Sequence, residues 1–494
     1  MILPSSAPSA QGVDAAGIIG FLDAARDRGL GLHGLAIARH GHMVVQGHWE
    51  PYSPDRLSLV YSLSKSLTAT AVGFLVQEGR LRLDAPILDH LPVRDRASVD
   101  ERWQRVEVRH CLSMTVGHDV DAWPAVAKAA AASEASTDWV DLVLRMPPEH
   151  EPGTVFTYNQ VATFLLSAAV THVTGERVVD VLRPRLFDVL GIGEVLWHTD
   201  PSGRDLGFSG AHLRLDDILA FAQFYLDRGV WQGRRVLEDA WFEEATRAFG
   251  PPNRDPEPKP DWHCGYGYSF WIARHGYRGD GAFGQFAIVL PEQDAVVAIT
   301  GEETDMQAVL DAVWAHLLPA LGGPAGPVTP AVAAADADLQ SRLDALAMPP
   351  VPSAVAGPDR FRFARAAASD LAPSYAAVAV ARAATGWQLT LETAGEELVI
   401  LAGDGTWHES VVRGPGGLLP VVASAGWVDH DCFRGEVLLI ETPHRVLVDG
   451  SRATGEARLS WREPSLMGDD LFDLAVRRPA TETTTGTAAG HLPA

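Results

Sequence analysis

The sequence predicts an α+β fold, in which an antiparallel β-sheet is flanked by helices and joined to an all-helical subdomain, followed by a C-terminal all-β domain. Two observations predict the first domain: hairpin patterns lie near both ends of residues 31–317, and helical patterns fill the stretch between them. A third observation predicts the second domain, because short alternating apolar runs separated by turn residues fill residues 361–474.

Two hairpins frame the first domain. Gly31–Glu50 contains two short strands around a turn at His40–His42. Near the other end, Gly284–Leu290 pairs with Ala295–Thr300. We expect strands from both ends of the domain to share one antiparallel sheet. Tyr266–Ile272 is expected as a further strand.

The helices are predicted from apolar residues at helical spacing. Ser62–Glu78 is the clearest of them, and Gly79 ends it. The same spacing predicts further helices at Ala15–Arg28, Val108–Met114, Trp139–Leu144, Gln160–Val173, Leu215–Arg228 and Met306–Leu317.

Composition divides the chain into four segments. Residues 1–320 form the first domain, and residues 321–358 form an Ala/Pro-rich linker with a helix at Pro330–Met348. Residues 359–478 form the all-β domain, and residues 479–494 form a disordered tail that is poor in apolar residues. The all-β domain has two expected roles, which are to shape a cleft of the first domain or to pair two copies into a homodimer.

Charge and composition limit the expected partners and compartment. The net charge of −23 argues against nucleic acid or an anionic membrane, because no basic field attracts phosphate groups. The longest apolar stretches, such as Val161–Val170, are shorter than the roughly 20 residues of a spanning helix. The start of the chain lacks the pattern of a secretory signal. Cys111, Cys264 and Cys432 are far apart and odd in number, which favours reduced thiols and a cytoplasmic location.

Ser62-Leu63-Ser64-Lys65 opens the helix predicted at 62–78 and is the main candidate for chemistry. Positions i and i+3 share a helical face, so the Lys65 amine can point at the Ser62 hydroxyl. The positive end of the helix dipole favours negative charge at this serine. A buried lysine has a lowered pKa and can take the serine proton, whereas arginine cannot. Only three of the 40 basic residues are lysine, although Ser-x-x-Lys also arises by chance.

Five segments, in order along the chain, resemble the β-lactamase-related serine hydrolases. This superfamily includes class C β-lactamases, penicillin-binding proteins, D-aminopeptidases, carboxylesterases and hydrolases of aminohexanoate oligomers. The segments are VYSLSKSLTATAVGFLVQEGRLRLDAPI, VEVRHCLSMTVGHD, EPGTVFTYNQVATFLLSAAV, SGAHLRLDDILAFAQFYLDRGVWQGRRVL and YRGDGAFGQFAIVLPEQDAVVAITG. The resemblance covers Gly31–Leu317 and implies a β-lactamase/transpeptidase-like fold for residues 1–320, with Ser62 as the nucleophile.

The resemblance also gives Tyr158 a share in proton transfer with Lys65, either as the base for acylation or as the acid for the leaving group. We expect a nearby ammonium to make the phenolate form of this tyrosine easier to reach. The alternative is that Tyr158 has no part in catalysis and that its ring only packs against the end of a helix. The family often has an asparagine two residues after the tyrosine, where this chain has Gln160, with Asn159 between them. Either amide is expected to hydrogen-bond the substrate or Lys65.

The segment Gly279–Gln285 (GDGAFGQ) departs from the Lys-Thr-Gly of β-lactamases. No cation is expected where a β-lactam carboxylate would bind, and Asp280 would repel it, so penicillins are not the expected substrate. Gly281 allows a substrate to approach the strand. By the resemblance, the backbone N–H groups of Ala282 and Ser62 form the oxyanion hole. The alternative is that this segment is a glycine-rich hairpin with no role in catalysis.

These features predict a serine hydrolase that cleaves carboxylic ester or linear amide bonds of small molecules through an acyl-enzyme on Ser62. No metal ion and no organic cofactor are expected. One alternative is a β-lactamase, a D-aminopeptidase or a D-Ala carboxypeptidase. Another is a catalytically silent binding module of the same fold. Trp262 and Trp271 are expected either to line the cleft or to pack in the core.

Overall fold

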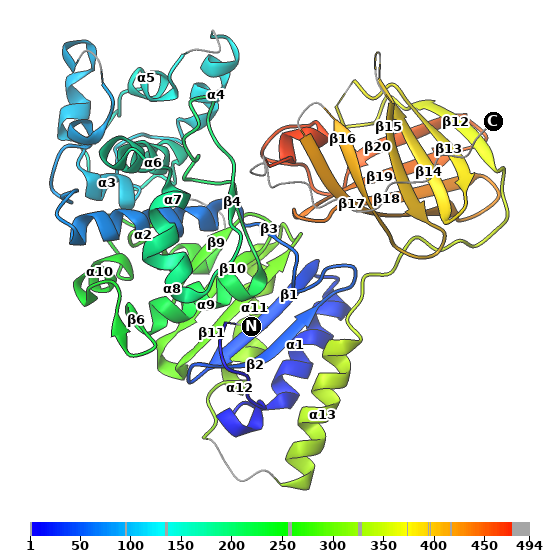
Figure 1. Ribbon diagram of the computed structural model, residues 1–494, viewed down its shortest axis with the longest axis horizontal. Helices are drawn as coiled ribbons and strands as arrows, with labels where there is room; N and C mark the ends of the chain where they lie inside the picture. Colours follow the sequence, from blue (N-terminus) through cyan, green and yellow to red (C-terminus); the bar gives the residue numbers. More distant parts are fainter. Residues whose placement is uncertain are drawn as a thin grey trace, which may run out of the picture.

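The central sheet of the first domain has six antiparallel strands (Figure 1). Their order is β2 (His42–His48), β1 (Leu32–Arg39), β11 (Ala295–Gly301), β10 (Gln285–Leu290), β9 (Tyr277–Gly281) and β8 (Trp271–Ile272). Because β1 pairs with β11 along its length, strands from both ends of the domain are neighbours, which confirms the prediction. The structure is a computed structural model that describes residues 2–93, 96–133, 137–254, 259–324, 329–372, 374–393, 395, 397–414 and 417–476. The tail predicted at 479–494 lies outside these residues.

Both faces of the sheet are buried, so its central strands are apolar without interruption. In β11, Val297 and Ile299 join the hydrophobic cluster on one face, and Val296 and Ala298 join the cluster on the other. The first cluster includes residues of α1 (Ala15–Arg28), α11 (Met306–Ala312), α12 (Leu318–Ala320) and α13 (Pro330–Asp344). The second includes residues of α9 (Leu215–Leu226) and of the helical subdomain.

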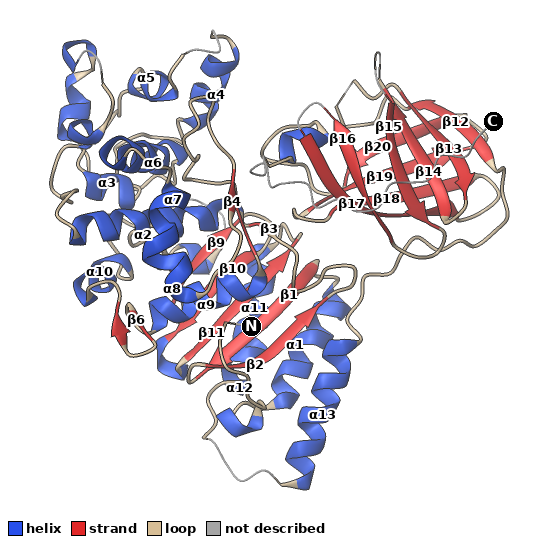
Figure 2. Ribbon diagram, viewed as in Figure 1, coloured by secondary structure: helices blue, strands red, loops and turns tan. Residues whose placement is uncertain are grey.

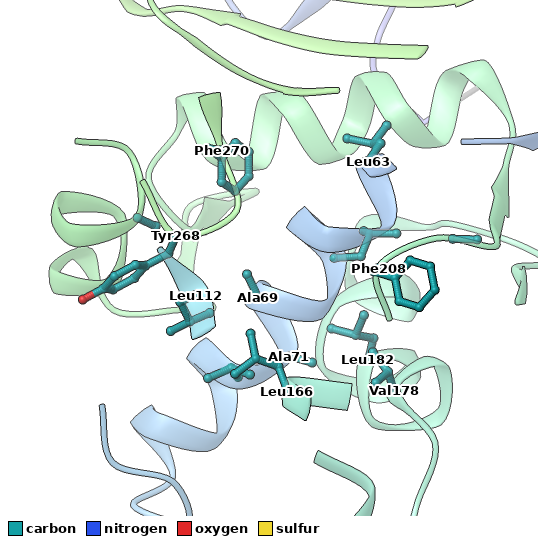
Figure 3. Close-up of a cluster of buried hydrophobic side chains, with 14 of the residues drawn as sticks. Leu63, Ala69, Ala71, Leu112, Leu166, Val178, Leu182, Phe208, Tyr268 and Phe270 are labelled. Carbon is teal, nitrogen blue, oxygen red and sulfur yellow. The ribbon is translucent and has the colours of Figure 1, made fainter. Parts of the chain in front are cut away.

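The helical subdomain is built around α2 (Ser64–Gln77), which is buried from Ser64 to Leu75. Figure 3 shows apolar side chains of the neighbouring segments surrounding this helix. The other helices of this region are α3 (Val108–Leu112), α4 (Trp123–Ala131), α5 (Trp139–Leu144), α6 (Gln160–Thr174), α7 (Val178–Leu182), α8 (Asp188–Leu190) and α10 (Asp239–Ala245). Short strands pair nearby as β3 (Ser58–Leu59), β5 (Ala211–Leu213) and β4 (Leu196–Trp197), and as β6 (Val230–Trp231) and β7 (Arg234–Arg235).

Three predicted elements differ in the structure. Only the end of the strand expected at Tyr266–Ile272 is extended, because Ser269 has a φ of 62° and turns the chain. The helix expected at Met306–Leu317 continues after α11 as a π-helical turn. The helix α13 of the expected linker packs on α1 and β2, and its Leu339 is buried in their cluster.

The C-terminal domain is a barrel-like all-β domain of nine strands in the described part of the chain (Figure 2). Their order is β15 (Glu397–Gly403), β14 (Gly386–Glu392), β13 (Ala377–Ala383), β12 (Arg360–Arg365), β20 (Glu456–Trp461), β19 (His444–Ser451), β18 (Cys432–Leu439), β17 (Gly417–Trp427) and β16 (His408–Gly414). A pairing of Gly403 with Ser424 joins β15 to β17 and closes the barrel. Its interior is filled by aromatic side chains such as Trp387 and Phe433.

Buried polar contacts attach the barrel to the first domain. The Leu59 N–H donates a hydrogen bond of 2.8 Å to the Glu441 carbonyl. At the end of β11, the carboxylate of Glu302 forms ion pairs with Arg445 and Arg462 of the barrel. Glu302 is only 3% exposed, so this contact is part of the protein interior. Within the described residues, no helix has both the length and the apolar character needed to cross a membrane.

Candidate active site

Ser62 and Lys65 lie next to each other at the start of α2. Ser62 belongs to the 3₁₀ turn Tyr61–Leu63, and Lys65 belongs to the first turn of the α-helix that follows. The helix thus begins two residues later than predicted, but the spacing of three residues still brings the two side chains together. Lys65 Nζ lies 2.8 Å from Ser62 Oγ and donates a second hydrogen bond of 2.8 Å to the Phe208 carbonyl.

The Lys65 amine is enclosed by protein. The residue is 1% exposed, and its Nζ lies 4.7 Å from the centre of the Tyr158 ring. Burial lowers the pKa of Lys65 to about 7, against the smaller opposing effect of the Asp121 and Asp280 charges. Among the described residues, Lys65 has no carboxylate within ion-pair distance. The amine is therefore close to half neutral at neutral pH.

Tyr158 faces the same serine from the loop before α6. Its ring stacks on Trp271 with 5.3 Å between the ring centres, and its hydroxyl interacts with the Ser62 side chain. Burial raises the pKa of Tyr158 well above its usual value, and the Asp280 charge adds to this effect. The expectation of an accessible phenolate is therefore wrong, because desolvation outweighs the nearby amine. Tyr158 is present as a phenol, which suits it to donate a proton.

Gly281 brings the end of β9 against the serine turn. A Cβ atom at position 281 would lie 2.0 Å from the Val60 carbonyl oxygen and 3.1 Å from the Ser62 nitrogen, so only glycine fits. Ala282 follows directly, and it lines the same cavity as Ser62. The two backbone N–H groups that the resemblance implies for an oxyanion hole therefore come from neighbouring segments.

A buried ion pair lies on β9, next to the segment that stands where β-lactamases have Lys-Thr-Gly. Arg278 is fully buried, and its Nε donates a hydrogen bond of 2.9 Å to Asp280. The guanidinium also lies over the Trp262 ring, 4.4 Å from its centre. Burial raises the pKa of Asp280, and Arg278 opposes this rise. The sequence prediction overlooked this cation, but Asp280 already pairs with it, and it does not line the cavity.

The two adjacent amides have different surroundings. Asn159 is 1% exposed, and its Oδ1 accepts hydrogen bonds of 3.3 Å from the Val161 and Ala122 N–H groups. Its Nδ2 donates to His118 Nδ1 at 2.9 Å. The expectation that Asn159 contacts substrate or Lys65 is therefore wrong, because its side chain caps α6 and supports the loop. Gln160 lines the cavity instead.

Ser62, Tyr158, Gln160, Asp280 and Ala282 all line one cavity of about 710 Å³, called the Ser62 cavity below. The remaining lining residues come from several distant segments: Asp119, Val120, Asp121, Phe156, Thr157, Asn253, Arg254, Lys259, Trp262, His263, Trp271, Thr304, Met306 and Leu466. Trp262 and Trp271 meet both expectations, because they line this cavity and also pack in the hydrophobic core.

Sequence reasoning missed Asp121 and Leu466. Asp121 lies two residues after the end of the family-like segment VEVRHCLSMTVGHD, and its Oδ1 accepts a hydrogen bond from the Gln160 N–H. The position of this carboxylate just after a family-like segment was the available signal. Leu466 belongs to the C-terminal domain, about 400 residues from Ser62 in the sequence. Local patterns carry no information about such a contact.

Comparisons with known proteins identify relatives of the first domain. A family model described as Beta-lactamase matches residues 21–318. The chain is 24% identical over 285 residues to the 6-aminohexanoate-dimer hydrolase of Paenarthrobacter ureafaciens, covering 53% of this chain and 70% of that protein. It is 28% identical over 284 residues to penicillin-binding protein 4 of Amycolatopsis lactamdurans, covering 48% of this chain and 70% of that protein.

A solved structure has the same fold. It is that of a Bacillus anthracis protein assigned as a 6-aminohexanoate-dimer hydrolase, with a TM-score of 0.52 and 16% identity. The match covers 65% of this chain and 87% of that one. The first domain thus has the predicted β-lactamase/transpeptidase-like fold, and the family match extends over more than half of the chain. The chain belongs to the Beta-lactamase family of serine hydrolases.

Proposed function

We propose that the protein cleaves carboxylic ester or linear amide bonds through an acyl-enzyme on Ser62. The observation that carries this proposal is the 2.8 Å contact between Ser62 Oγ and the buried amine of Lys65. A serine hydroxyl becomes a good nucleophile only when a base takes its proton. With a pKa of about 7, Lys65 is matched to that task at neutral pH.

The proposed reaction begins when Ser62 Oγ attacks the substrate carbonyl and its proton passes to Lys65. The carbonyl oxygen becomes an oxyanion, which the N–H groups of Ser62 and Ala282 bind. The phenol of Tyr158 gives its proton to the leaving alcohol or amine, and Lys65 returns a proton to the phenolate. Water then attacks the acyl-enzyme and gives a proton to Lys65, which passes it to Ser62 Oγ, so that Ser62 leaves as a hydroxyl and the amine is neutral again.

The Ser62 cavity supports a substrate with a bulky apolar part. Phe156, Trp262 and Trp271 line its walls, and pockets of this kind bind ligands mainly through apolar contact. Val120 and Leu466 also line it, although they are 72% and 69% exposed. Large apolar side chains left exposed beside a cavity are typical of a binding surface.

A fluorophosphonate probe tests the proposed nucleophile. We expect it to label the wild-type protein stoichiometrically at Ser62, and Ser62→Ala to lose both the label and hydrolysis of p-nitrophenyl esters. Ser113→Ala is a suitable control, because Ser113 is buried and hydrogen-bonded to the Arg109 carbonyl away from the cavity lining. Labelling that persists in Ser62→Ala would identify a different nucleophile.

Each alternative activity predicts a different result with other substrates. Hydrolysis of nitrocefin without hydrolysis of short esters would favour the β-lactamase alternative, and release of D-amino acids from peptides would favour a D-peptidase. The Arg278–Asp280 pair supports the ester or linear amide instead, because it offers no unpaired cation to a β-lactam carboxylate. A wild-type protein that takes no label would favour a binding module.

A further inference from the structure

Two residues next to the proposed oxyanion donors point into the C-terminal barrel. Tyr61 precedes Ser62, and Phe283 follows Ala282. Their φ angles are 44° and 66°, in the left-handed region that bulky residues rarely adopt. Both side chains are buried in the hydrophobic cluster of the barrel, with their ring centres 5.3 Å apart. Such backbone conformations persist only where the surroundings hold them.

His444 of β19 is the barrel residue on which the two rings converge. Tyr61 Oη lies 2.6 Å from His444 Nε2, and the Phe283 ring meets the imidazole edge at 4.8 Å between centres. His444 Nδ1 donates to the Glu463 carbonyl at 2.9 Å, which leaves Nε2 as the acceptor for the Tyr61 hydroxyl. Burial lowers the pKa of His444 to about 4, so the imidazole is neutral.

The same tyrosine reaches the barrel segment that lines the Ser62 cavity. Its hydroxyl interacts with the side chain of Ser465 and the backbone of Leu466, and both lower the Tyr61 pKa against the larger effect of burial. Leu466 itself is part of the cavity wall. Tyr61 therefore connects the backbone at Ser62 both with His444 inside the barrel and with the wall that the barrel contributes.

We infer that His444 is a positioning residue for the oxyanion hole. Through Tyr61 and Phe283, it holds the N–H groups of Ser62 and Ala282 in the orientation that receives the oxyanion. This inference rests on the proposed function. It gives the C-terminal barrel a part in the reaction itself, because preorganised donors need no rearrangement when charge develops on the substrate.

The test compares binding of the transition state with binding of the substrate. In His444→Phe and Tyr61→Phe, we expect kcat/KM for a p-nitrophenyl ester to fall about tenfold to a hundredfold, mainly through kcat. The affinity for an alkyl boronic acid, whose tetrahedral serine adduct occupies the oxyanion hole, should fall in parallel. His444→Gln keeps an acceptor and a donor and should recover most of the loss. His430→Phe, at an exposed histidine of the same barrel, is the control.

Hydrogen–deuterium exchange gives a readout that does not depend on activity. We expect the backbone around Ser62 and Ala282 to exchange faster in His444→Phe, while α6 exchanges as in the wild type. If the wild type takes no fluorophosphonate label, the proposed function fails, and the exchange measurement still decides whether His444 positions these segments. Unchanged kcat/KM and unchanged exchange in His444→Phe would overturn the inference. So would a loss that follows thermal stability alone and is not rescued by His444→Gln.

Discussion

Lys65 and Glu302 are both buried charged residues, but their surroundings act on them in opposite ways. Lys65 is surrounded by a hydroxyl, a carbonyl and aromatic rings, and burial lowers its pKa to about 7. Burial alone would raise the pKa of Glu302, but His33 together with Arg445 and Arg462 outweighs it and holds that pKa below its usual value.

The difference lies in the presence of a counter-charge. A lysine amine that is buried without a counter-charge loses its proton more readily, whereas a carboxylate that is buried beside cations stays ionised. The first arrangement suits the proposed proton acceptor of the reaction. The second arrangement joins two domains, because Glu302 follows β11 and Arg445 belongs to β19.

The largest expected effect comes from making the Lys65 charge permanent. Lys65→Arg keeps the positive charge, but a guanidinium cannot lose its proton, so kcat/KM for ester hydrolysis should fall by at least about 10⁴-fold. Steady-state kinetics measure this loss. The control is Lys128→Arg, the same substitution at an exposed lysine, which should leave kcat/KM unchanged. If Lys65→Arg retained a tenth or so of the activity, Lys65 would not be the base.

A smaller effect is expected from removing the charge of Glu302. Glu302→Gln leaves Arg445 buried without its main carboxylate partner on the first domain, so the free energy of unfolding should fall by about 3 kcal/mol. Urea titration measures this change. Asp84→Asn, which breaks an exposed pair with Arg82, is the matched control and should change stability little. Equal effects of the two substitutions would mean that the domain contact is not a buried ion pair in solution.

The smallest expected effect is the pH dependence of the wild type. Because the Lys65 pKa is about 7, the amine is protonated below this pH, and kcat/KM should rise about tenfold per pH unit there and level off above it. Between the folded pKa and the usual 10.5, only the unfolded chain binds this proton, so stability should rise with pH in that window. Kinetics across this range check the inflection, which Glu302→Gln should leave in place. Activity that falls as pH rises through about 7 would contradict the assignment.

The sequence predicted the parts of the site that depend on local spacing. The contact of Ser62 with Lys65 follows from three residues along a helix. At Gly281 the expected reason was the approach of a substrate, whereas the structure shows close approach of the Val60 backbone. Asn159 and Gln160 show the limit of such reasoning, because they carry the same functional group one position apart. The start of α6 directs one amide to the backbone and the other to the cavity.

What the sequence by itself determined was the α+β fold, the order of its segments and the pairing of serine with lysine. These follow from periodicity and from covalent spacing, which act over a few residues. The tertiary structure alone decided that Tyr158 stays a phenol, that the Arg278–Asp280 pair is buried, and that the barrel reaches Ser62 through Tyr61 and His444. Desolvation and long-range contacts depend on residues that are far apart in the sequence and that only the folded chain brings together.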